Sequence, residues 1–257
     1  MCGGDEVSDM NDPFDFTGQV VLVTGGTRGL GRAMALGFAD RGAEVIVVGR
    51  KPETCREVEL ELQSRGHRAW GLSAHVGRWD AVSALAETAW GLAGRIDVLI
   101  NNAGMGATST SPDMSEALFD KLIGVNLKGP FRLTALLAPK MATAGGGAVV
   151  NISSTGAIRP DPSYGVYAAA KSALNVLTRA HALEFGPSVR VNAIMPGPFM
   201  TDMAASWGEE LDRTTTAAAG RIGRPHDIVT AALYLASQAS AYTTGSVVTV
   251  DGGERGG

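Results

Sequence analysis

The stretch VVLVTGGTRGLG, residues 20–31, decides how this chain folds. Its first part, residues 20–24, is a continuous apolar run of the length of a buried strand. A glycine-rich turn follows and opens a helical pattern at about residue 30. A buried strand, a tight turn and a helix in this order form the first half of a βαβ unit, from which parallel sheets with helical layers are built.

The same alternation continues along the rest of the 257 residues. Further apolar runs predict strands at about 45–48, 69–73, 97–100, 148–152, 189–194 and 247–250. Helical patterns lie at about 30–41, 53–65, 79–92, 115–141, 164–185 and 226–237. We therefore predict one α/β domain, 17–257, with a doubly wound parallel sheet of about seven strands, buried between helices on both faces. A flexible acidic tail, 1–16, precedes it, and the stretch 200–220 has no clear pattern.

The composition argues against several classes of function. The formal net charge is −4 and the basic residues do not cluster, which gives no electrostatic footprint for nucleic acid. The N-terminus is acidic without an apolar run, and no stretch approaches the roughly 20 apolar residues of a membrane span. Cys2, Cys55 and the histidines lack metal-ligand or redox spacing. We expect a cytoplasmic protein with no nucleic-acid, membrane or metal partner.

Glycines in the first turn predict an anion site. They would let a diphosphate approach the backbone and the N-terminus of the following helix. The spacing of Gly25, Gly29 and Gly31 is G-x-x-x-G-x-G, which departs from the G-x-G-x-x-G pattern of long-chain dinucleotide binders. A turn of this kind can also be only a tight turn. The candidate contacts are Gly25, Thr27, Arg28, Gly29, Leu30 and Gly31.

The end of the second predicted strand indicates which dinucleotide binds. An acidic residue there would accept a hydrogen bond from the ribose 2′-hydroxyl, whereas a basic residue would pair with a 2′-phosphate. This strand ends in Gly49-Arg50-Lys51, and Arg28 can supply a second cation. A guanidinium matches phosphate geometry and gains little from a neutral hydroxyl, so the sequence favours NADP over NAD. The alternative is that Arg50 is a solvated loop residue.

Tyr167 and Lys171 stand four residues apart in a predicted helix, so both side chains lie on one face. An adjacent cation favours a phenolate and lowers the pKa of a phenol from about 10 towards the working range of a general acid or base. The spacing therefore predicts a proton-transfer pair. Such pairs also occur by chance in many helices, and the spacing alone leaves a solvated pair open.

Several motifs in one order resemble the short-chain dehydrogenase/reductase family, in its form of about 250 residues. The resemblance runs from about residue 16 to 253. Independent motifs in the same order leave little room for coincidence. They are the glycine turn, Asn101-Asn102-Ala103-Gly104, Asn126, Asn151-Ile152-Ser153-Ser154, the Tyr167 and Lys171 pair, Pro196-Gly197-Pro198-Phe199-Met200-Thr201, Gly220-Arg221-Ile222-Gly223-Arg224-Pro225 and Val250-Asp251-Gly252-Gly253.

The resemblance implies a Rossmann-like fold, a homotetramer and an NADP(H)-dependent oxidoreductase that interconverts a ketone or aldehyde and an alcohol. It implies that Tyr167 transfers the proton, Ser154 binds the same oxygen, Lys171 stabilises the tyrosinate and holds the ribose, and Asn126 anchors a water. His75 stands where the family usually has Asp. The further cofactor contacts are Lys51, His75, Val76, Asn102, Ala103, Gly104, Pro196, Gly197, Phe199 and Thr201.

A mostly apolar substrate pocket is predicted, which suits a small or medium hydrophobic or aromatic-bearing molecule. Its walls are Met105, Ser154, Thr155, Ile158, Arg159, Tyr164, Phe199, Met203 and Trp207. Arg159 could meet a substrate carboxylate, although a surface arginine is favoured. Two alternatives stay open, reduction of a 3-oxoacyl thioester and a non-catalytic dinucleotide-binding sensor or scaffold. The second fits poorly, since a pure binder has no use for a tuned phenol.

Overall fold

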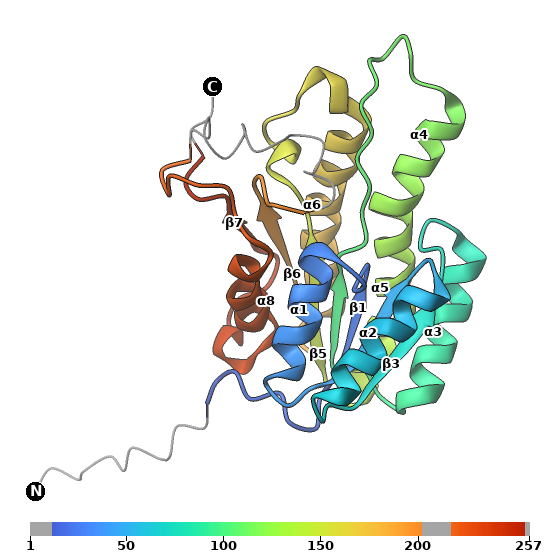
Figure 1. Cartoon of the computed structure of the whole chain (residues 1–257), viewed down its shortest axis with the longest axis vertical. Helices are drawn as coiled ribbons and strands as arrows, with labels where there is room; N and C mark the ends of the chain where they lie inside the picture. The colour runs from blue at the N-terminus through green and yellow to red at the C-terminus, as the bar shows by residue number, and fades with distance from the viewer. Residues whose placement is uncertain (1–11, 202–216, 255–257) are drawn as a thin grey trace, which may run out of the picture.

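The computed structural model describes residues 12–201 and 217–254, and a parallel sheet forms their centre (Figure 1). Its seven strands run in the order β3-β2-β1-β4-β5-β6-β7. The reversal between β1 and β4 is the topological switch of a doubly wound sheet. The strands are β1 (Val20–Thr24), β2 (Glu44–Gly49), β3 (Ala69–Ser73), β4 (Val98–Asn101), β5 (Gly147–Ile152), β6 (Val189–Pro196) and β7 (Val247–Val250).

Helices cover both faces of this sheet, which gives the predicted three-layer α/β architecture (Figure 1). Apolar side chains of α1, α2 and α8 pack in one core cluster with one face. Those of α3 and α5, with the end of α6, pack in a second cluster with the other. The helices are α1 (Gly29–Ala39), α2 (Pro52–Ser64), α3 (Trp79–Ala93), α4 (Glu116–Ile123), α5 (Gly129–Thr143), α6 (Gly165–Phe185) and α8 (Val229–Ala236).

The single helix predicted at 115–141 is interrupted in the structure. A π-helical turn, η1 (Gly124–Lys128), separates α4 from α5. Both glycines at its ends press on backbone atoms of the segment after β3, since a Cβ built on Gly129 would lie 2.2 Å from Val76 O. π-turns inside helices are frequent at functional sites. Here the turn carries Asn126, one of the candidate site residues.

The sheet edges and the start of the chain also differ from the prediction. Strands β3 and β7 are largely half-buried because each has a neighbour on one side only, whereas the strands between them are almost fully buried. Phe16 is fully buried and meets the Phe38 ring edge-on at 4.9 Å. The packed part of the chain therefore starts ahead of residue 17.

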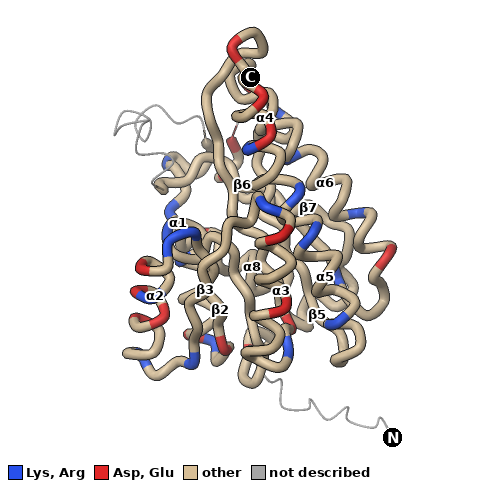
Figure 2. The backbone as a smooth tube through the Cα atoms, turned by 90° about the vertical axis from the view of Figure 1, so that its right-hand side faces the viewer, with Lys and Arg blue, Asp and Glu red and all other residues tan. Residues whose placement is uncertain are grey.

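Charged residues of both signs line α2, as Figure 2 shows. Arg32 of α1 donates to both carboxylate oxygens of Glu61 on α2, from Nε to Oε2 at 3.2 Å and from Nη2 to Oε1 at 2.5 Å. Two parallel bonds from one guanidinium fix the orientation of the pair. This ion pair therefore ties α2 to the helix that follows the glycine turn.

Arg190 of β6 supports the end of α8, and its removal tests how the sheet holds this helix. Its guanidinium donates to the carbonyl oxygens of Leu235 (2.8 Å), Ala236 (3.1 Å) and Ser237 (3.0 Å). Arg190→Met removes three charge-assisted hydrogen bonds, although the Ser240 hydroxyl still donates to Leu235 O and Ser237 O. We therefore expect the free energy of unfolding to fall by about 3 kcal/mol in urea denaturation. Arg78→Met, which removes an exposed ion pair with Asp80, is the control and should leave the free energy of unfolding nearly unchanged. Equal losses would contradict the supporting role.

Candidate active site

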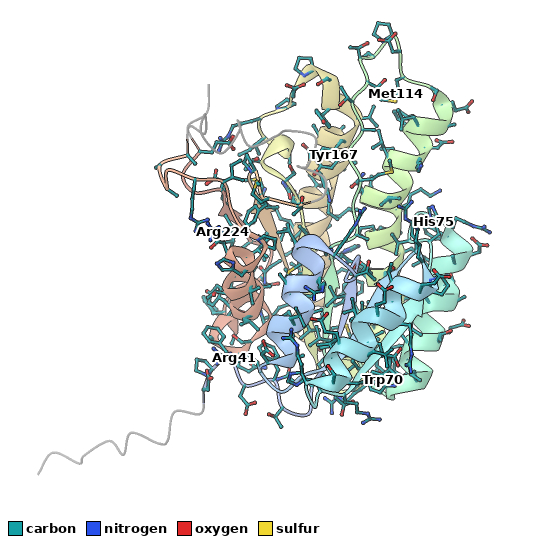
Figure 3. All side chains as sticks on the ribbon, viewed as in Figure 1. Arg41, Trp70, His75, Met114, Tyr167 and Arg224 are labelled. Atoms are coloured by element: carbon teal, nitrogen blue, oxygen red, sulfur yellow. The ribbon has the colours of Figure 1, made fainter. Side chains whose placement is uncertain are left out.

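The candidate segments gather at the carboxyl ends of the parallel strands, the edge where open α/β sheets bind ligands. The glycine turn follows β1, Asn102 follows β4, Ser154 follows β5 and Gly197 follows β6. Figure 3 labels Tyr167 near the start of α6, above the sheet, and His75 beside the start of α3.

Thr24 and Asn102 lock the glycine turn onto the neighbouring strand. The Asn102 side chain donates to Thr24 O at 2.9 Å and to Gly25 O at 3.2 Å, and the Thr24 hydroxyl accepts from the Asn102 and Ala103 amides at 3.0 and 3.1 Å. A Cβ on Gly31 would lie 2.2 Å from Gly25 O, and Gly25 has a φ of +65°. These two positions therefore require glycine, which fixes the shape of the turn.

The start of α1 is open to an anion. Arg28 is its N-cap residue and makes no side-chain cap, and the first turn holds no acidic residue. The backbone N–H groups and the positive end of the helix dipole therefore suit a phosphate. Thr201 lies beside this turn, since a Cβ on Gly29 would be 3.4 Å from Thr201 Cγ2. Leu30 instead packs against the core.

The end of β2 lies next to the glycine turn. A Cβ on Gly49 would be 2.7 Å from Thr27 Cγ2, so the backbone before Arg50 packs directly on the turn. Arg50 and Lys51 are exposed. Within residues 12–201 and 217–254, neither of their side chains forms an ion pair. Two cationic side chains, those of Arg50 and Lys51, therefore face solvent beside the glycine turn.

His75 and Val76 follow β3, and they differ in burial: the His75 ring is half-buried, whereas the Val76 side chain lies in the core. The Gly77 amide donates to His75 Nδ1 at 3.2 Å, which leaves Nε2 as the N–H side of a neutral ring. His75 is half-buried, so this N–H is the group that an adenine acceptor could meet. Val76 is buried in the second core cluster, so only its backbone can contact a ligand.

Lys171 is the most enclosed cationic group of the candidate site. Its side chain is 3 % exposed, and Nζ donates to Ile152 O at 2.7 Å. Nζ lies 5.8 Å from the centre of the Tyr167 ring. A Cβ on Gly104 would lie 3.5 Å from Nζ and 3.1 Å from Asn126 Oδ1. The loop after β4 thus approaches both groups closely because position 104 has no side chain.

Asn126 joins the loop after β4 to the π-turn. It is fully buried, and its Nδ2 donates to Met105 O at 2.8 Å and to Leu122 O at 2.9 Å. Its Oδ1 accepts from the Met105 amide at 3.2 Å. Both amide hydrogens are therefore used, and one acceptor position of Oδ1 remains.

Ser154 opens the short 3-10 turn η2 (Thr155–Ala157) and accepts a hydrogen bond from the Gly156 amide at 3.1 Å. Gly156 lies between the two candidate hydroxyls, since its Cβ would be 3.4 Å from Ser154 Oγ and 3.8 Å from Tyr167 Cε1. Ser154 is also close enough to the Tyr167 phenol to lower its pKa. The structure thus brings Ser154, Tyr167, Lys171 and Asn126 to one place.

The prediction that the pKa of Tyr167 is lowered below its ordinary value is wrong for this structure. Burial raises the pKa of the Tyr167 phenol, while the hydrogen bond with Ser154 lowers it and the charge of Tyr164 raises it. Burial also lowers the pKa of Lys171 to about 8. The ammonium lies over the ring and donates to Ile152 O, so it does not meet the phenol oxygen. Desolvation therefore dominates at both groups.

The buried Lys171 predicts a pH-dependent stability. Its pKa is about 8 in the folded protein and about 10.4 in an unfolded chain. Between these values the unfolded state binds more protons, so the free energy of unfolding rises with pH. Relative to Lys171→Met, the wild type should gain roughly 2 kcal/mol between pH 7 and about pH 9.5. Urea denaturation of both proteins at the two pH values measures this gain, and a constant difference would contradict it.

The predicted substrate-pocket residues differ in how near they lie to Tyr167 and in how exposed they are. The Thr108 hydroxyl donates to the Tyr164 hydroxyl at 3.1 Å, and the Tyr164 ring lies 6.4 Å from that of Tyr167. Met105 is half-buried, and Ile158 is 59 % exposed on the loop after Ser154. Met203 and Trp207 lie outside the described residues.

One predicted wall is wrong, and a second is engaged in ion pairs. The Phe199 side chain is 5 % exposed and belongs to the core, where its ring covers Gly223. Only its backbone can reach a ligand. Arg159 is neither a free surface arginine nor a free carboxylate receptor, because its guanidinium pairs with Asp251 at 3.0 Å and with Glu254 at 3.6 Å. A sequence pattern cannot show such partners, since they are about ninety residues away along the chain.

Comparison with known proteins agrees with this geometry. The sequence profile described as short chain dehydrogenase matches residues 19–212. The chain belongs to the short-chain dehydrogenase family. An uncharacterised oxidoreductase of Mycobacterium tuberculosis (strain CDC 1551 / Oshkosh) is 36 % identical over 247 residues, which cover 94 % of each protein.

Solved short-chain dehydrogenase structures share the whole fold. A 3-oxoacyl-(acyl-carrier-protein) reductase of Agrobacterium tumefaciens C58 with NADP bound is 32 % identical, with a TM-score of 0.90, and the match covers 96 % of this chain and 99 % of that one. A 7α-hydroxysteroid dehydrogenase complexed with NADH and 7-oxoglycochenodeoxycholic acid gives the same identity, TM-score and coverage. This chain is therefore an oxidoreductase of that family with a Rossmann-like fold.

Some residues that shape this short-chain dehydrogenase site were missed from the sequence. Thr24 ends an apolar strand, and nothing in its pattern indicates that its hydroxyl would bind the loop after β4. Asp251 stands in the motif Val250-Asp251-Gly252-Gly253, and no sequence signal marks Glu254 as a partner of Arg159. Among the described residues, no group of His, Cys, Asp and Glu side chains is arranged to hold a metal ion. Within the same part of the chain, no helix has the length and apolar character needed to cross a membrane.

Proposed function

We propose that this enzyme is an NADP(H)-dependent oxidoreductase that interconverts a ketone or aldehyde and an alcohol on a small or medium, mostly hydrophobic molecule. One observation carries the proposal. Lys171, buried with its Nζ 5.8 Å from the Tyr167 ring centre, lies beside Gly104 at the carboxyl edge of the sheet. That edge also carries the glycine turn, so a proton-transfer group and an anion site share one cleft.

The residues present fit a dinucleotide. The start of α1 carries no side-chain cap from Arg28 and suits a diphosphate, and Gly29 adds no side chain of its own to the turn. Arg50 and Arg28 would pair with a 2′-phosphate, and His75 would meet the adenine. The backbone of Gly197 and the Thr201 hydroxyl would hold the carboxamide. When bound, the nicotinamide supplies or accepts a hydride.

Tyr167 would hold and transfer the proton. Its raised pKa keeps the phenol protonated at neutral pH, so the hydroxyl is a donor to the oxygen of a carbonyl group. Ser154 would donate a second hydrogen bond to that oxygen and fix its position. Lys171 would stabilise the tyrosinate left after transfer, because an ammonium in a low-dielectric site favours a nearby anion.

Asn126 would position the loop after β4 beside the Tyr167 and Lys171 pair. Its amide holds the backbone of Met105, which keeps the loop after β4 against Lys171. The remaining acceptor position of Oδ1 is where a water could bind. Such a water would connect Lys171 with solvent.

The test is a panel of ketones, aldehydes, quinones and 3-oxoacyl thioesters, followed by the absorbance of NADPH and repeated with NADH. We expect the fastest turnover with uncharged hydrophobic ketones and NADPH. A higher kcat/KM for the thioesters would favour the acyl-thioester alternative. NADPH binding by fluorescence without turnover of any compound would favour the non-catalytic sensor.

A further inference from the structure

Arg159 is held by a small ion cluster, which we call the Arg159 cluster and define as Arg159, Asp251 and Glu254. Its Nη2 donates to Asp251 Oδ2 at 3.0 Å, and its Nη1 donates to Glu254 O at 2.9 Å. Nη1 also lies 3.6 Å from Glu254 Oε2. The side chains of Arg159, Asp251 and Glu254 are 34 %, 11 % and 28 % exposed, so the cluster is partly shielded from solvent.

This cluster spans the substrate side of the strand ends. Arg159 lies on the loop that starts at Ser154, and its amide donates to Thr155 O at 2.9 Å. Asp251 follows β7 and packs on Gly197, where a Cβ would lie 2.7 Å from Asp251 Cβ. The ion pair thus connects the loop that starts at Ser154 with Asp251, the residue that packs against Gly197.

The charges in the cluster do not balance. One guanidinium faces two carboxylates, which leaves one excess negative charge. Lys171 is buried and donates to Ile152 O, while Arg28 and Arg50 lie at the dinucleotide end. Among the described residues, the other predicted walls are apolar or neutral, with Met105, Ile158 and Tyr164 as the large side chains, and the exposed Asp161 adds a further carboxylate to the same loop.

We propose that the Arg159 cluster makes the enzyme select carbonyl substrates that bear no carboxylate on the side facing the loop after Ser154. The inference rests on the proposed function and narrows its substrate class. A substrate carboxylate would meet excess negative charge and an arginine that already pairs with two carboxylates. Repulsion of this kind gives specificity without any added contact to the favoured substrate.

Three aryl ketones test the inference: acetophenone, 4-acetylbenzamide and 4-acetylbenzoate. The last two have nearly the same shape and differ in charge. We expect the wild-type kcat/KM for the carboxamide to exceed that for the carboxylate by about tenfold, the effect of one partly screened charge at close range. The ratio should shrink as ionic strength rises.

Variants should move this ratio in opposite directions. Glu254→Gln and Asp251→Asn each remove one negative charge from the cluster, so the ratio should fall by roughly threefold to tenfold. Arg159→Met leaves two carboxylates unpaired, so the ratio should rise. General disruption of the loop would change activity on both ketones together. Glu44→Gln, which removes a carboxylate paired with Arg68 at the opposite end of β2, is the matched control and should leave the ratio unchanged.

Equal turnover of the carboxamide and the carboxylate by the wild type would overturn the inference. So would a ratio that Glu254→Gln, Asp251→Asn and Arg159→Met all leave unchanged. If the wild type reduces none of the three ketones but reduces others in the broader panel, the aryl-ketone expectation and this inference both fail. If it reduces no carbonyl compound at all, the proposed function itself fails.

Discussion

Replacing Tyr167 with phenylalanine should lower kcat for ketone reduction by about 10³-fold, the typical contribution of a positioned general acid. The ring stays in place, so the contact with Lys171 Nζ and the packing of α6 are kept. Only the hydroxyl that carries the proton is lost. NADPH affinity, measured by fluorescence titration, should change by less than about threefold, since the glycine turn and the start of α1 are untouched.

Tyr164→Phe is the matched control, because it makes the same change one turn earlier. It removes the hydrogen bond with the Thr108 hydroxyl and leaves Tyr167 unaltered. We expect a change in KM with kcat within about threefold of the wild type, as expected for a wall that binds substrate and transition state alike. Near wild-type kcat in Tyr167→Phe would remove Tyr167 from the proton-transfer role. An equal loss in both variants would point to disturbed packing.

The layered fold could be predicted because local signals and global topology agree. Continuous apolar runs such as 20–24 and 148–152 form strands buried on both faces, and the structure places them at the centre of the sheet. What the sequence did not show was the π-turn at Gly124–Lys128. It arises from close approach to the backbone at Val76, a tertiary contact that leaves no periodic signal. The strand order likewise depends on packing between distant segments.

The sequence predicted which residues form the candidate site, but it did not predict the pKa shifts or the ion pairs of these residues. Motif spacing brought Tyr167 and Lys171 to one helix face, and the structure agrees. The direction of the pKa shift of Tyr167 could not be inferred, because burial depends on every element packed around the ring. The partners of Arg159 were hidden for the same reason: Asp251 and Glu254 come from the far end of the chain.

Replacing Arg50 with aspartate should shift the ratio of kcat/KM for NADPH over NADH by at least about 100-fold towards NADH. A charge-assisted hydrogen bond to the 2′-phosphate is lost, and a carboxylate that can accept from the 2′-hydroxyl is gained. Each change contributes about 1.5–3 kcal/mol on the scale of hydrogen bonds to charged groups. The exposure of Arg50 beside the turn that carries Arg28 is the observation behind this expectation.

Arg28 should retain part of the NADP preference, because it lies on the glycine turn itself. The double variant Arg28→Ala/Arg50→Asp is therefore expected to move the ratio further than Arg50→Asp alone. Arg56→Asp makes the same charge change on α2, where Arg56 pairs with Glu59 at 2.7 Å, and should leave the ratio within about twofold of the wild type. Steady-state kinetics with one ketone and both dinucleotides decides the question. An unchanged ratio in Arg50→Asp would make Arg50 a solvated loop residue, and the choice of dinucleotide would then depend on other residues around the cleft.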